Sequence, residues 1–116
     1  MLVLTALAFL AQEEPDQTVT TAPRPIHGEP WITDRDYPPE AGRNRVRTTV
    51  RIALQVGEEG EVTGCRIIRS GGTRLLDHET CRLVSKRARF TPAIGPAGSF
   101  TAEYQTTIHW PPRARR

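Results

Sequence analysis

Residues 50–69 read VRIALQVGEEGEVTGCRIIR. In residues 50–56 the large apolar side chains alternate with smaller or polar ones, which is the period of a half-buried strand. The glycine-bounded stretch 57–60 is typical of a hairpin loop, and residues 62–69 predict a second strand. This part of the chain therefore predicts an antiparallel hairpin with one face turned toward a core.

A helix and a third strand follow the hairpin. Residues 75–89 carry apolar side chains at helical spacing, and Thr73 is a suitable N-cap. Residues 101–110 alternate again and predict a long strand, while the Pro- and Gly-rich residues 92–98 predict a loop. The layout predicts a two-layer α+β fold, in which one main helix packs on a three-stranded antiparallel sheet. A long, regular edge strand in such a sheet is a hazard unless it is covered or used for pairing.

The two cysteines suggest a bridge between the layers. Cys65 lies in the second predicted strand and Cys81 in the predicted helix, 16 residues further on. In an exported protein, cysteines placed in this way most often form a disulfide. A zinc site would need four ligands, and the three histidines of the chain show no close pairing. A nucleophilic cysteine is the remaining alternative, but neither cysteine lies in a nucleophile motif.

Length and motifs exclude several classes of protein. A chain of 116 residues holds one small domain, and neither a TIM barrel nor a nucleotide-binding domain with a separate substrate domain. No apolar run approaches the roughly 20 residues that span a bilayer. The sequence contains no GxGxxG, P-loop, HExxH or GxSxG motif. We therefore expect no enzyme, no catalytic residue, no metal site and no cofactor.

Charge is spread unevenly along the chain. Residues 1–40 hold seven acids and two bases, whereas residues 41–116 hold fourteen bases and six acids. On the predicted helix, Arg82, Lys86 and Arg89 form a basic outer face. The ordinary interpretation is a solvated surface, and the functional one is attraction of acidic partners such as lipid head groups, acidic proteins or nucleic acid.

The chain divides into four segments. Residues 1–11 are an apolar run that ends at acidic residues, like the hydrophobic region of an export signal. We expect either a short export signal or the remainder of a longer segment that anchors the protein in the inner membrane. A terminal stretch that packs on its own domain is the less favoured alternative, because an acidic linker follows it. Residues 12–33 have the Pro/Thr-rich, acidic composition of a linker, and Trp31 marks where packing begins. We assign residues 34–110 to the folded domain and residues 111–116 to a basic tail.

Several short segments, taken together, carry a family resemblance. They are residues 37–41 (YPPEA), the strand that follows, and residues 60–63 (GEVT), 67–72 (IIRSGG), 76–77 (LD) and 88–93 (ARFTPA). In order and spacing they resemble the C-terminal domain of TonB over residues 34–110. The resemblance implies an α+β fold, a location in the periplasm of a Gram-negative bacterium, and binding to outer-membrane transporters.

The resemblance also implies how a partner binds. The N-terminal "box" segment of a transporter adds as a strand beside the last strand of the domain. We expect the binding half of an energy transducer without its energy-coupling half, because the sequence shows no membrane helix and no long proline-rich spacer. The implied partner-binding residues are Tyr37, Pro38, Thr101, Glu103, Tyr104, Gln105, Thr106 and Thr107.

Two further functions are compatible with the sequence. A structural envelope protein could bind acidic surfaces through its basic residues, or form a homodimer through its edge strand, with no role in transport. Binding of nucleic acid through the basic helix face and tail is the second, and export of the protein would exclude it. Dependence on salt separates electrostatic binding from strand pairing.

Overall fold

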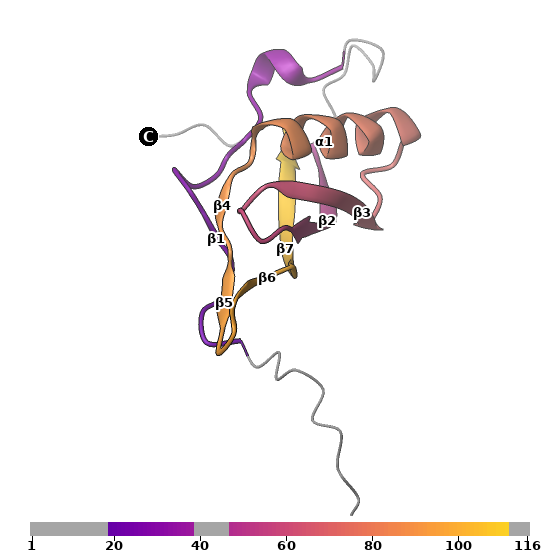
Figure 1. Ribbon diagram of the computed structural model, residues 1–116. Coiled ribbons are helices and arrows are strands. Elements are labelled where there is room, and N and C mark those ends of the chain that lie inside the picture. Colours follow the sequence, from indigo (N-terminus) through magenta and orange to yellow (C-terminus); the bar gives the residue numbers. More distant parts are fainter. Residues whose placement is uncertain (1–18, 39–46, 112–116) are drawn as a thin grey trace, which may run out of the picture.

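The computed structural model describes residues 19–38 and 47–111. Figure 1 shows the long helix lying across the small sheet, with the N-terminal segment running beside the chain that follows the helix. The predicted export signal and nearly all of the predicted basic tail lie outside the described residues. The elements are β1 (Arg24–Pro25), the short 3-10 helix η1 (Asp34–Asp36), β2 (Thr48–Val56), β3 (Val62–Arg69), α1 (Arg74–Arg87), β4 (Phe90–Thr91), β5 (Ala93–Gly95), β6 (Gly98–Phe100) and β7 (Ala102–Trp110).

The central sheet has the strand order β3-β2-β7, and both pairings are antiparallel. β2 is the middle strand, and its four alternating apolar side chains are fully buried because they lie beneath α1. The predicted hairpin is the β2–β3 pair, and the predicted third strand is β7. The predicted α+β fold, with one main helix on a three-stranded antiparallel sheet, is confirmed.

The helix begins where its cap predicts. The Thr73 hydroxyl accepts a hydrogen bond from the backbone N–H of Leu76 at 3.1 Å, which satisfies one of the free donors of the first turn. The helix ends at Arg87, two residues before the predicted end, because Ala88 turns into extended backbone and leads into β4. The residues that α1 buries are Leu76, Thr80, Leu83 and Val84, which follow the predicted spacing. Arg87, the next position of the same stripe, is exposed instead.

Much of the predicted linker packs on the domain. β1 pairs with β4, Thr21 forms a bridge with Ile94, and Trp31 is only 8% exposed. The predicted loop 92–98 also differs, because it forms most of the β5–β6 hairpin. Strands of two or three residues are too short to show alternation in the sequence, and here they are defined by their backbone pairing, which is distant for β1 with β4 and local for β5 with β6.

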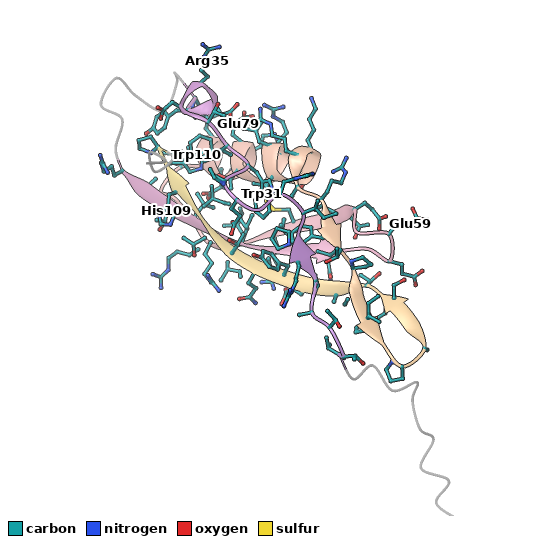
Figure 2. The ribbon with its side chains drawn as sticks, turned by 90° about the vertical axis from the view of Figure 1, so that its left-hand side faces the viewer. Trp31, Arg35, Glu59, Glu79, His109 and Trp110 are labelled. Atoms are coloured by element: carbon teal, nitrogen blue, oxygen red, sulfur yellow. A yellow bond between two sulfur atoms is a disulfide. The ribbon has the colours of Figure 1, made fainter. Side chains whose placement is uncertain are left out.

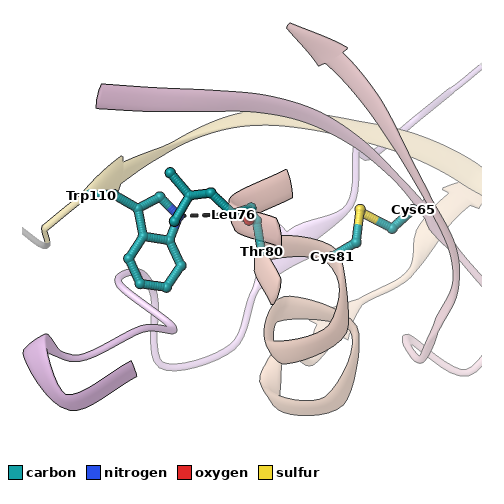
Figure 3. Close-up of a disulfide and its surroundings, with 5 residues drawn as sticks. All are labelled: Cys65, Leu76, Thr80, Cys81 and Trp110. Carbon is teal, nitrogen blue, oxygen red and sulfur yellow. Dashed lines mark hydrogen bonds between the residues drawn. A yellow bond between two sulfur atoms is a disulfide. The ribbon is translucent and has the colours of Figure 1, made fainter. Parts of the chain in front are cut away.

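The core contains one buried polar chain. The indole N–H of Trp110 donates to the Thr80 hydroxyl at 2.8 Å, and that hydroxyl donates to the carbonyl of Leu76 at 2.7 Å (Figure 3). Trp110 and Thr80 are 1% and 0% exposed. Because each polar atom has its partner, the large indole can be buried without an unsatisfied donor, and the end of β7 is fixed to α1.

The predicted disulfide is present. Cys65 of β3 and Cys81 of α1 are bridged, with 5.7 Å between their Cα atoms (Figure 3). That separation lies within the usual range for disulfides. The bridge ties the outer strand of the sheet to the helix layer, and the described residues include no free cysteine.

Gly60 closes the β2–β3 turn against β4. Its φ is +85°, and a Cβ at this position would lie 1.8 Å from the Phe90 carbonyl oxygen. Gly72 is a matched control, because its φ is +111° but a Cβ there would meet nothing within 4 Å. We expect Gly60→Ala to lower the free energy of unfolding by about 3 kcal/mol and Gly72→Ala by about 1 kcal/mol, measured by urea denaturation. Equal losses would show that the contact with Phe90 has no effect.

Candidate functional site

The free edge of β7 is the most regular unpaired edge of the central sheet. Nine consecutive residue pairs join β7 to β2, from Thr48–Trp110 to Val56–Ala102, without a shift in register. Within residues 19–38 and 47–111, β7 pairs with β2 alone, and no backbone hydrogen bond from outside the sheet reaches it. The outward-facing N–H and C=O groups of β7 therefore form a continuous row that can template another strand.

The opposite edge of the sheet is irregular. The pairing of β3 with β2 shifts twice, between Arg51 and Ile52 and between Gln55 and Val56, so that no β2 residue lies opposite Ile68 or Thr63 in the register. Each such bulge bends the strand and interrupts its row of hydrogen-bonding groups. Bulges are a common device that protects an edge from pairing. The asymmetry leaves β7 as the more regular of the two edges.

The side chains of β7 on the open face of the sheet form one polar network. Arg66 donates to Glu103 at 2.8 Å, and Gln105 donates to the other oxygen of Glu103 at 3.1 Å. Arg51 donates to Gln105 at 3.3 Å and to Thr107 at 2.9 Å. Hydrogen bonds from Gln105 and then Arg66 lower the pKa of Glu103 below its ordinary value. Three predicted site residues, Glu103, Gln105 and Thr107, are thus fixed in place on one face.

Two other predicted site residues point to the helix side of β7. The Tyr104 ring packs on Phe90 with 4.9 Å between ring centroids, and burial, followed by the charge of Glu29, raises the pKa of Tyr104. Thr106 is 8% exposed, and its hydroxyl donates to the Glu29 carboxylate at 2.7 Å. Thr101 lies exposed between β6 and β7. The predicted set 101–107 therefore occupies one continuous edge.

Sequence reasoning missed Glu29. It lies in the segment assigned to the linker, 77 residues from Thr106 along the chain. A single acidic residue among prolines carries no local signal that it contacts a distant strand. Only the packing of the N-terminal segment beside β7 shows the contact.

Tyr37 and Pro38 lie elsewhere. Both are buried, and the Tyr37 ring meets Trp110 edge-on with 5.8 Å between centroids. Tyr37 therefore packs at the end of β7 that is remote from Thr101, and Pro38 is the next residue in the chain. A hydrogen-bonded ion pair holds the preceding turn, because Arg87 donates to both Asp36 oxygens at 2.6 and 2.9 Å. The bonds from Arg87 hold the pKa of Asp36 well below its usual range.

The predicted basic face is largely engaged within its own helix. Arg82 makes two hydrogen bonds to Glu79, each of 2.8 Å. Arg89 lies two residues beyond the end of α1, so the predicted helix face does not include it, and it donates to the carbonyls of Ala88 and Lys86. Positive side chains at this end also complement the helix dipole. Two of the three cations thus have intramolecular partners, which weakens the case for a surface built to attract acidic partners.

The described residues show few other candidate sites. A shallow hollow is lined by Thr49, His109 and neighbours at the end of the β2–β7 pair. No group of three or more histidine, cysteine or acidic side chains that could hold a metal ion is found in the described ranges. Within those ranges, no helix combines the length and apolarity that crossing a bilayer requires.

Comparison with known proteins identifies the family. The model of the family described as "Gram-negative bacterial TonB protein C-terminal" matches residues 33–112. The chain belongs to this family. Comparison with curated proteins found no match. Among solved structures, the solution structure of the TonB C-terminal domain of Pseudomonas aeruginosa has a TM-score of 0.57 at 18% identity, and the match covers 83% of this chain and 92% of that one.

Membership confirms the resemblance seen in the sequence. The Pseudomonas aeruginosa structure shares the TonB C-terminal fold with this chain. TonB C-terminal domains are protein-interaction modules of the Gram-negative envelope, and they are not enzymes. The family and fold together indicate a TonB-like protein that interacts with envelope proteins such as transporters.

Proposed function

We propose that this protein works in the periplasm and binds the N-terminal segment of a TonB-dependent outer-membrane transporter by adding it as a strand to β7. The observation that carries the proposal is the unbroken register of β7 beside an edge with no backbone partner among the described residues. Main-chain hydrogen bonds along such an edge give affinity, and alternate side chains give specificity.

The two layers give this edge the rigidity that strand addition needs. β7 is fixed along its length by β2, and its last residue, Trp110, is bonded to α1. Tyr37 and Pro38 support the same end, since Tyr37 packs on Trp110. In this proposal Thr101 to Thr107 receive the partner, whereas Tyr37 and Pro38 hold the receiving strand in place.

An NMR titration of the oxidised full chain with peptides from the transporters of the same host tests the proposal. We expect amide shifts concentrated in β7 that persist at high salt, because strand pairing does not depend on long-range charge. Peptides N-methylated on one alternate set of amides should lose binding, and peptides methylated on the other set should retain it, since only one set faces β7.

Scrambled peptides of the same composition are the control. No shift with any transporter peptide in a folded sample would overturn the proposal. Shifts that vanish at high salt and spread over Arg82, Lys86 and Arg89 would instead support an envelope protein that binds acidic surfaces. Shifts in β7 that depend on protein concentration alone would support pairing between two copies.

A further inference from the structure

The carboxylate of Glu29 lies beside the middle of the proposed binding edge. It accepts the hydrogen bond from the Thr106 hydroxyl at 2.7 Å, and it contributes to the raised pKa of Tyr104. In Figure 2 the N-terminal segment around β1 passes in front of β7. A formal negative charge is therefore placed next to two side chains that alternate along the receiving strand.

The loop that carries Glu29 is fixed at both ends. On one side, β1 pairs with β4 and the backbone N–H of Ile26 donates to the Arg89 carbonyl at 2.7 Å. On the other side, Trp31 is buried against Phe90, with 5.8 Å between ring centroids, and its carbonyl accepts a bond from Arg87. The carboxylate is thus held by the fold and does not swing on a free tail.

A strand added to β7 would bring one of its side chains to this carboxylate. Adjacent strands lie about 4.8 Å apart, and directly opposite residues point to the same face of the sheet. The partner residue opposite Thr106 would therefore point to the helix side, where Glu29 lies. At that distance a cationic side chain is favoured and an acidic one is disfavoured.

We propose that Glu29 makes β7 selective for partner segments that carry a lysine or arginine opposite Thr106. The inference rests on the proposed strand addition and adds the chemistry of the segment that is preferred. Glu29 is exposed, so the charge pair is screened by solvent. We expect a preference of about two- to fivefold in affinity for lysine over glutamate at that position.

A charge-swap experiment tests the selectivity. Peptides that bind the full chain are made with lysine, glutamine or glutamate at each alternate position in turn, and affinities are measured at low and high salt. One position should show the preference for lysine, and this preference should weaken as the salt concentration rises. In Glu29→Lys the order of affinities at that position should reverse, so that the glutamate peptide binds more tightly than the lysine peptide. Glu58→Lys, which makes the same charge change in the remote β2–β3 turn, should leave the order unchanged.

Each outcome decides the inference. The same order of affinities in Glu29→Lys and in the unaltered chain, with peptides still bound, would overturn the selectivity and leave strand addition intact. An equal gain in affinity for every peptide in Glu29→Gln would also overturn it, since the loop would then be an obstacle and not a selector. Absence of binding for all peptides would overturn both this inference and the proposed function.

Discussion

Replacement of Trp110 by alanine is expected to lower the free energy of unfolding by about 3–5 kcal/mol, the usual range for removal of a buried tryptophan. The side chain is 1% exposed, contacts Tyr37 edge-on and donates to Thr80. The change therefore opens a cavity and disconnects β7 from both the helix and the entry segment. Small domains have a total stability of about 5–15 kcal/mol, so the loss would be a large fraction of the stability.

Urea denaturation followed by circular dichroism measures this loss. The matched control is His109→Ala, because the neighbouring side chain points to the other face of the sheet and is only partly buried. Trp110→Phe keeps an aromatic ring but loses the N–H donor, and we expect it to remain folded with a loss of about 1–3 kcal/mol. Equal stabilities of the alanine variants at 109 and 110 would contradict the role given to the indole.

Removal of the disulfide is the second large effect. Replacing both Cys65 and Cys81 by alanine should lower the free energy of unfolding by about 3 kcal/mol, because the bridge closes a loop of 16 residues in the unfolded chain. Reduction of the unaltered protein provides the matched control, since it removes the same cross-link without changing the sequence. We expect both samples to unfold at a lower urea concentration than the oxidised protein.

The disulfide prediction also has a spatial consequence. The bridge joins α1 to β3, and β3 is the edge strand opposite β7 in the central sheet. Loss of the bridge should therefore leave peptide binding at β7 unchanged at temperatures where the domain remains folded. An unchanged urea midpoint in the double variant would contradict the stabilising role of the bridge, and loss of peptide binding in a folded sample would contradict the independence of the two edges.

The elements with strong local patterns were predictable from the sequence. The alternation in residues 50–56 and 101–110 predicted β2 and β7, and the cap at Thr73 predicted the start of α1. The pairing of Cys65 with Cys81 could be predicted because one lies in a predicted strand and the other in a predicted helix. The spacing of apolar residues in these segments indicated that the helix packs on the sheet. In each of these cases the signal lies within a few residues of the element that it specifies.

The remaining features depend on contacts between distant residues. β1 and β4 are two residues each, too short to show a period, and the bond between Glu29 and Thr106 joins residues 77 positions apart. The bulges of β3 arise from its register against β2, which the β3 sequence alone does not reveal. The receiving strand could therefore be predicted, whereas the N-terminal segment beside it and the protection of the opposite edge could not.

The difference between the two edges limits how copies of this domain can associate. Open-ended growth of a sheet requires two pairing edges on every copy, one to accept and one to offer. Here β7 is regular and β3 is interrupted twice, so each copy has one edge of the central sheet that is suited to pairing. Two copies that met edge to edge would form a closed pair with no regular edge left over. At high local concentration the central sheet should therefore be limited to dimers rather than fibres.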